Sequence, residues 1–120
     1  MADCLIFRSQ GFLFALPSSV ISGVSFEEWL SGISFADYFF HSYEEEQHHV
    51  ILSEGYVLHV QEVVEIQMLS GEVPPVPGYI FETGGGWLRG ILWHGATPVL
   101  LLNETHLTVG LASYVPELSI

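Results

Sequence analysis

Apolar residues in this chain occur in short runs, and these runs are separated by glycine, proline and serine. Short apolar runs bounded by such turn-forming residues are typical of β-strands. Turn sequences at Ser9–Gly11, Ser53–Gly55 and His94–Ala96 each lie between two of the runs. The pattern therefore predicts an all-β fold, with strands at Leu5–Phe7, Phe12–Leu16, Val50–Leu52, Tyr56–Val60, Trp87–Trp93 and Thr97–Leu102.

Two short segments have helical character instead. Phe26–Leu30 follows Ser25, which is a good helix cap, and places Glu27 and Glu28 in a first turn that favours negative charge. Ser34–Phe40 is expected to form a second short helix. An extended linker without regular pairing is predicted at Pro74, Pro75 and Pro77.

A weak internal repeat organises the strands. Phe12–Val20 aligns with Tyr56–Val64, and each copy follows a strand and a glycine turn. Both copies therefore read as the second strand of a hairpin, followed by a turn and another apolar segment. Two such units favour two small sheets or barrels of related topology. Chance similarity between two apolar hairpins is the alternative.

The order of these elements resembles the CheW-like domain family, the adaptor fold of bacterial chemotaxis signalling. Leu5–Pro17 followed by Val20 is similar to the family's opening strand, turn and strand, and Tyr56–Val64 is similar to its middle strand pair. The closing pattern of a proline linker, a strand with glycine and a leucine-rich strand is similar to Pro74–Pro77, Leu88–Ile91, Val99–Asn103 and Leu107.

The resemblance implies two small SH3-like β-barrels, joined by short helical connections and packed about a shared core. Residues 1–120 then form a single CheW-like domain with approximate halves at 1–47 and 48–120. The chain departs from the family in two places. It lacks the Asn-x-Arg-Gly motif that follows the opening hairpin, and Asn103 stands where the family has an aspartate. We therefore expect the first barrel to be abbreviated.

The charge balance excludes binding to nucleic acid and electrostatic binding to anionic lipid. The chain of 120 residues carries 14 acidic and 2 basic residues, a formal net charge of −12, and its basic residues are Arg8 and Arg89. Binding to nucleic acid or to anionic lipid requires clustered lysine or arginine. We therefore expect neither kind of partner. Hydrophobic residues make up 49% of the chain, which is too many for a disordered protein.

Targeting signals are weak as well. Leu13–Ile21 is apolar enough to resemble a signal-peptide core, but Asp3 offsets Arg8 before it and Pro17 interrupts it. No run reaches the length of a membrane helix. The single Cys4 gives no reason to expect an oxidising compartment. We expect a cytoplasmic protein without membrane insertion.

The segment His41–His49 is the most suggestive candidate for a metal site. It holds three histidines and three glutamates, which are suitable ligands for zinc, nickel or copper. In a strand, however, His48 and His49 point to opposite faces and cannot chelate together. A solvated acidic connector is the competing interpretation, and a small metal-binding protein using His41, His48 and His49 is the alternative function.

No set of residues predicts an enzyme. Cys4 lacks the electropositive surroundings that activate a thiol, and Ser18 and Ser19 lack a nucleophile elbow. The run Gly84–Gly86 is followed by Trp87 and not by the lysine of a phosphate-binding loop. An enzyme of an unrecognised β-barrel type would need convergent polar groups that the sequence does not show. We expect no cofactor.

Dense aromatic residues in the first forty positions point to a partner surface. A shortened first barrel would leave part of this apolar surface uncovered, and such patches bind partners. We expect a homo-oligomer or another protein to cover it. The predicted contact residues are Trp29, Phe35, Tyr38 and Phe39, with Arg89 as an orienting charge. The resemblance implies a non-enzymatic adaptor or scaffold that contacts a CheA-type histidine kinase or a chemoreceptor.

Overall fold

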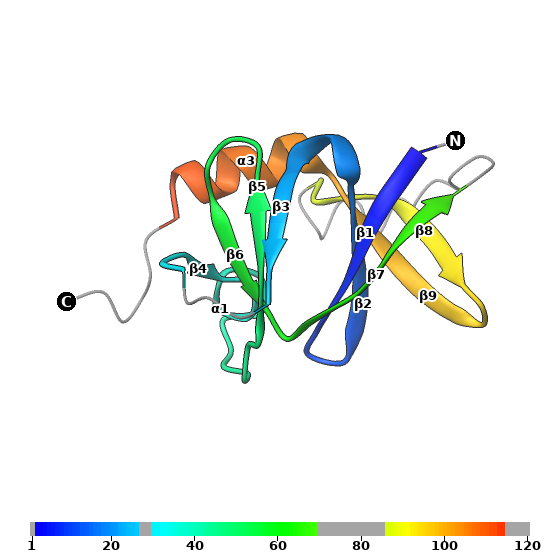
Figure 1. Cartoon of the computed structure of the whole chain (residues 1–120), viewed down its shortest axis with the longest axis horizontal. Helices are drawn as coiled ribbons and strands as arrows, with labels where there is room; N and C mark the ends of the chain where they lie inside the picture. Colours follow the sequence, from blue (N-terminus) through cyan, green and yellow to red (C-terminus); the bar gives the residue numbers. More distant parts are fainter. Residues whose placement is uncertain (1, 27–29, 70–85, 115–120) are drawn as a thin grey trace.

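The computed structural model describes residues 2–26, 30–69 and 86–114, and most of the described residues lie in strands (Figure 1). The strands in chain order are β1 (Ala2–Ser9), β2 (Phe12–Pro17), β3 (Ile21–Ser25), β4 (Ile33–Ser34), β5 (His48–Leu52), β6 (Val57–Val60), β7 (Glu62–Leu69), β8 (Leu88–His94) and β9 (Thr97–Leu102). The helices are the 3₁₀ turn η1 (Ser18–Val20), α1 (Phe35–Phe40) and α3 (Glu104–Ala112). None of the helices in these residues is long and apolar enough to cross a membrane.

The strands form two sheets. A five-stranded sheet has the order β7-β1-β2-β9-β8, and a four-stranded sheet has the order β3-β5-β6-β4. Pairing is antiparallel except between β2 and β9 and between β4 and β6. Each sheet takes strands from both residues 1–47 and residues 48–120.

The two copies of the internal repeat occupy corresponding places in the two sheets. Both copies do form the second strand of an antiparallel hairpin, in β1–β2 and in β5–β6. In each hairpin, that second strand also pairs with a parallel strand, which is β9 in one case and β4 in the other. The first strand of each hairpin pairs with the strand that follows the other hairpin, β1 with β7 and β5 with β3. The two sheets are therefore built by the same rule.

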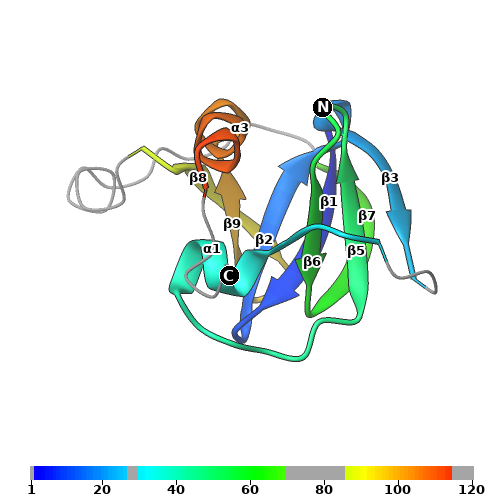
Figure 2. The same cartoon turned by 90° about the vertical axis from the view of Figure 1, so that its left-hand side faces the viewer.

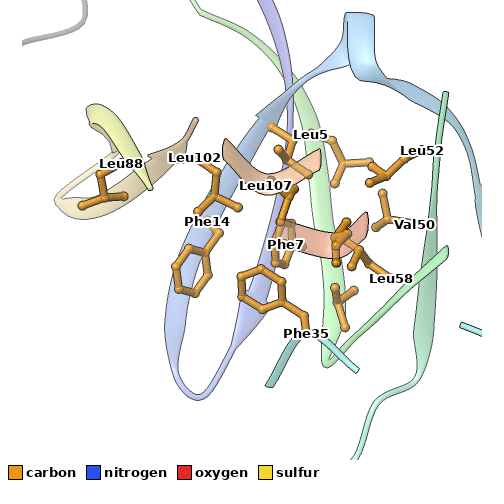
Figure 3. Close-up of a cluster of buried hydrophobic side chains, with 13 residues drawn as sticks. Leu5, Phe7, Phe14, Phe35, Val50, Leu52, Leu58, Leu88, Leu102 and Leu107 are labelled. Atoms are coloured by element: carbon orange, nitrogen blue, oxygen red, sulfur yellow. The ribbon is translucent and has the colours of Figure 1, made fainter. Parts of the chain in front are cut away.

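The inner strands β1, β2 and β9 of the five-stranded sheet are buried on both faces, which accounts for their continuous apolar runs. Alternate side chains of its strands enter the main core, together with side chains from β5, β6, α1 and α3 (Figure 3). The main core contains Leu5, Phe7, Phe14, Leu16, Phe35, Val50, Leu52, Leu58, Val60, Leu88, Leu102, Leu107 and Leu111. The intervening side chains form a second core of Cys4, Ile6, Leu13, Ala15, Leu92, Val99 and Leu101.

The predicted SH3-like barrels are not confirmed, because neither sheet closes. The five-stranded sheet comes nearest to closure, since the imidazole of His94 on β8 contacts the carboxylate of Glu65 on β7. This side-chain contact joins the two outer strands of the sheet at one point. The all-β prediction is confirmed at the coarser level of strands and sheets.

All six predicted strands are present, in β1, β2, β5, β6, β8 and β9. The helix predicted at Ser34–Phe40 is α1, and the Ser34 side chain caps it by accepting a hydrogen bond from the Asp37 amide at 3.2 Å. The helix predicted at Phe26–Leu30 lies mostly outside the described residues, as does the proline linker. The prediction missed the strands β3, β4 and β7, the 3₁₀ turn η1 and the helix α3.

Candidate functional site

Two hollows lined mainly by apolar side chains open on the surface of the described part of the chain. The first lies between α1, α3 and the start of β8, and we call it the α1–α3 cavity. It has a volume of about 280 Å³ and is lined by Tyr38, Phe39, Trp87, Leu102, Asn103, His106 and Leu107. In Figure 2, α1 and α3 lie toward one side of the molecule and β3 lies toward the other.

Helix caps position the walls of the α1–α3 cavity. The Asn103 side chain accepts hydrogen bonds from the Thr105 and His106 amides at 3.1 and 3.2 Å, which fixes the start of α3. The Asn103 amide donates to the Trp87 carbonyl at 2.8 Å and ties β8 to this point. The side chain and the amide of Asn103 are thus already engaged, and most of the residues that line the cavity are apolar.

The second hollow lies between β3 and β7, and we call it the β3–β7 groove. Its volume is about 310 Å³, and it is lined by Leu5, Ser18, Ile21, Ser22, Gly23, Val24 and Ile66. Among the described strands, β3 pairs only with β5 and β7 pairs only with β1. Each therefore has an outer edge that a further strand could join. The side chain of Ile66 is 67% exposed on β7.

Sequence reasoning missed the β3–β7 groove because it predicted neither β3 nor β7. A signal was present in Val63-Val64-Glu65-Ile66, which has the β-branched composition of a strand. From the sequence alone, Val63 and Val64 are placed at the end of the repeat and of the stretch similar to the middle strand pair of the CheW-like family, and no strand is assigned to Ile66. Ile66 pairs directly with Leu5 of β1, so its side chain extends the same face as a core residue.

The predicted contact residues have different positions. Tyr38 and Phe39 line the α1–α3 cavity. Phe35 is completely buried in the main core, so its side chain packs the interior and is not available to a partner in this structure. Arg89 is exposed on β8, where its guanidinium forms an ion pair of 2.9 Å with Glu104. Trp29 lies outside the described residues.

The three histidines predicted for the alternative metal site do not converge. His41 is exposed and ends α1 in the left-handed conformation, with φ of 54°. The Nδ1 atom of His48 accepts a hydrogen bond from the Val63 amide at 2.7 Å. His49 is buried and its ring contacts that of His59 at 4.5 Å between centroids. Across residues 2–26, 30–69 and 86–114, no three histidine, cysteine, aspartate or glutamate side chains are placed to hold a metal ion.

Two buried titratable groups have perturbed pKa values without forming a catalytic pair. Burial, with a smaller contribution from Asp3, raises the pKa of the Cys4 thiol, which makes it a poorer nucleophile. Burial lowers the pKa of His59, and the nearby His49 acts in the same direction. The Nε2 atom of His59 lies 2.6 Å from the Leu30 carbonyl oxygen. This contact ties His59 on β6 to Leu30.

Glu46 has the most strongly perturbed carboxyl group of the described residues. Burial raises its pKa from 4.5 to about 7, and the neighbouring Glu44 carboxylate contributes in the same direction. Hydrogen bonds from the Ser34 side chain and the amides of Phe35 and Ala36 oppose the shift. Glu46 thus fastens the segment after α1 to the first turn of that helix.

We expect Glu46→Gln to stabilise the protein at high pH. The folded state keeps the Glu46 proton to about pH 7, whereas the unfolded state loses it near the ordinary pKa. The contribution of Glu46 to the free energy of unfolding is therefore fully present below pH ~4.5, and it is lost as the pH rises through ~7. Glutamine does not ionise, so the variant does not lose stability in this pH range. Above neutral pH its free energy of unfolding should exceed that of the unaltered chain by about 1 kcal/mol, a value reduced for the partial exposure of the side chain.

The measurement is the free energy of unfolding from urea titrations at acidic and alkaline pH. Glu45→Gln is the matched control, because Glu45 is exposed and its substitution removes the same formal charge. A Glu46→Gln advantage that stays constant with pH, or that equals the effect of the control, would contradict the prediction.

Comparison with known proteins gives a result for the fold. No family model matches the sequence, and no curated protein matches it. The structure is similar to that of the scaffolding protein TtCheW from Thermoanaerobacter tengcongensis, with a TM-score of 0.63 and 12% sequence identity. The similarity covers 85% of this chain and 88% of that chain. At this identity the comparison shows a CheW-like fold, as the sequence predicted, and the fold alone.

Proposed function

We propose that this chain is a non-enzymatic adaptor of chemotaxis-type signalling, which acts in the cytoplasm through protein–protein contacts. The partner is a CheA-type histidine kinase or a chemoreceptor. The CheW-like fold supports this proposal, because the structurally similar protein is a scaffolding protein. The alternative metal-binding function has no comparable support among the described residues.

The observation that carries the proposal is the β3–β7 groove. It combines an apolar hollow with two strand edges that have no neighbouring strand in the described sheets. Exposed apolar surface with this geometry accommodates a partner's apolar side chains while its backbone pairs with an edge. The groove also lies where the two sheets meet, so a partner bound there contacts both.

Two of the predicted contact residues belong to a second surface, at the α1–α3 cavity. Tyr38 and Phe39 line that cavity, and we retain them as contact residues. Arg89 remains the proposed orienting charge, and it is paired with Glu104 at the start of α3. Trp29 remains a prediction from sequence.

We expect Ile66→Glu to weaken partner binding at least about tenfold. The substitution places a carboxylate in the lining of the β3–β7 groove. A bound partner would remove water from this carboxylate without offering it an opposite charge, which costs binding free energy. Because Ile66 is largely exposed in the free chain, the fold should be little affected. Binding is measured by calorimetry with a purified CheA-type kinase and with a chemoreceptor cytoplasmic fragment.

Val109→Glu is the matched control, since Val109 is 65% exposed on α3 and lines neither hollow. The control should bind as the unaltered chain does. Equal affinities for Ile66→Glu and the unaltered chain would remove the groove from the proposal. Absence of binding to both the kinase and the receptor by the unaltered chain would overturn the adaptor function itself.

A further inference from the structure

Four aromatic rings form a continuous surface that ends at the α1–α3 cavity, and we call it the aromatic strip. Its members are Phe12, Phe40, Phe39 and Trp87. Phe12 stacks on Phe40 with 6.0 Å between centroids and an angle of 17°. Phe40 meets Phe39 at 4.9 Å, and Phe39 meets Trp87 edge to face at 4.4 Å. The strip thus runs from the β1–β2 turn across α1 to the cavity.

One side of the aromatic strip packs on the main core, and the other side is accessible to a partner. Phe14, which is completely buried, contacts Phe39 at 5.2 Å and Phe40 at 6.0 Å between centroids. Phe12 is 54% exposed, and the other three rings are partly buried. A partner would therefore meet rings that are already positioned, which reduces the entropy lost on binding.

Carboxylates lie along the strip. Near Phe12, the Glu44 carboxylate accepts hydrogen bonds from the Ser9 hydroxyl at 2.6 Å and the Gln10 amide at 2.7 Å. Asp37 lies one turn before Phe40 on α1 and accepts a hydrogen bond from the Tyr114 hydroxyl. Glu104 begins α3 beside the cavity. The titratable bases nearby are His41, which follows Phe40, and His106, which lines the cavity.

Permanent positive charge on the chain is already engaged. Arg8 forms an ion pair of 2.8 Å with Glu62, and Arg89 forms one with Glu104. The sequence has no lysine and a formal net charge of −12. A partner with basic side chains would be attracted to this chain, whereas a second copy or an acidic protein would be repelled.

We propose that the aromatic strip and the α1–α3 cavity dock a cationic segment of a partner protein, in which arginine or lysine stands next to an apolar side chain. The cation lies over the aromatic faces near Glu44 and Asp37, where the ring quadrupoles attract it. The apolar side chain enters the cavity. This inference rests on the adaptor function and names the chemistry of its second surface.

The test uses a synthetic peptide in which arginines alternate with leucines on a glycine spacer. Calorimetry measures its binding to the full chain at low and at physiological salt. We expect saturable binding with one peptide per chain, which weakens as salt increases because the attraction is partly electrostatic. A peptide with glutamate at the arginine positions should not bind, and a peptide with glycine at the leucine positions should bind about tenfold more weakly.

Variants of the chain separate the strip from general charge attraction. Phe12→Ala should weaken binding about tenfold, and Phe12→Leu should not restore it, because leucine keeps apolar area but has no ring. Trp93→Ala is the matched control, since Trp93 is 60% exposed on β8 outside the strip. Thermal unfolding of each variant verifies the fold.

Equal binding to Phe12→Ala and Trp93→Ala would overturn the proposal, because it would show attraction by net charge alone. Binding of the glutamate peptide as tightly as the arginine peptide would also overturn it. The Ile66→Glu variant should bind the peptide normally. The peptide experiment uses neither the kinase nor the receptor as its probe. Its outcome can therefore be told apart from a failure of the proposed adaptor function.

Discussion

Phe35→Ala is expected to destabilise the protein by about 4 kcal/mol, the largest effect of the substitutions considered. Truncating a buried phenylalanine removes its transfer free energy and leaves a cavity. Phe35 is completely buried, and its ring meets Phe7 at 5.0 Å and Phe14 at 5.1 Å between centroids (Figure 3). It also stacks on Phe39 at 5.2 Å. Urea denaturation, with the free energy extrapolated to water, measures the loss.

Phe35→Ala should also disturb the aromatic strip and the α1–α3 cavity, because α1 has only six residues. A helix of that length is not stable by itself and depends on packing. Phe35 and Ala36 are its buried residues, so losing the Phe35 ring should also displace Phe39 and Phe40. Partner binding would then fall together with stability.

Phe12→Ala is the control for this prediction. Phe12 is more than half exposed, so its truncation should cost less than about 1 kcal/mol. A Phe35→Ala variant of unchanged stability that selectively lost partner binding would contradict the packing role. It would instead support the sequence-based prediction that Phe35 is a contact residue.

Much of the sheet architecture could be predicted because its signals are local. The runs Leu5–Phe7, Phe12–Leu16 and Val99–Leu102 are apolar at consecutive positions. This composition suits strands buried on both faces, and the structure places alternate residues of these strands in two different cores. The glycine turns between the strands are equally local, and Gly11 and Gly55 have positive φ of 81° and 99°.

The missed elements depend on contacts distant in sequence. β7 is a strand because it pairs with β1, through partners such as Ile66 and Leu5. α3 contains threonine, valine and glycine, which are weak helix formers. It forms because Asn103 caps it and because Leu107 and Leu111 are buried in the main core. Local propensity does not predict α3, and for β7 it supplies only the short run Val63–Ile66, whose pairing with β1 is not visible in the sequence.

The candidate site shows the same limit at the level of single residues. Aromatic density points to α1, where Tyr38 and Phe39 line a cavity, and their role as contact residues stays a prediction. The same density included Phe35, four positions before Phe39, which the structure places wholly inside the core. Composition cannot separate a buried ring from a half-exposed one. Only the packing of α1 against β1 and β2 makes that distinction.

The second large effect is expected at Gly110, where alanine should destabilise the protein by about 1–3 kcal/mol. Alanine normally stabilises a helix relative to glycine by up to about 1 kcal/mol. Here an added Cβ would overlap the hydroxyl of Tyr38 and lie 3.1 Å from its Cζ. Overpacking of this kind outweighs the gain in helix propensity. The sign of the change therefore reports whether Tyr38 packs directly on α3.

A double-mutant cycle with Tyr38→Phe tests that contact. Tyr38→Phe removes the overlapping hydroxyl, so Gly110→Ala should cost far less in the phenylalanine background, with a coupling of at least about 1 kcal/mol. Tyr38 is also braced by Tyr114, at 5.5 Å between centroids, and this contact limits its retreat from the new methyl group. Alanine that stabilises both backgrounds equally would show that the two residues do not meet. A positive coupling would instead show that α3 holds Tyr38 in the wall of the α1–α3 cavity, where the proposed apolar anchor of the partner binds.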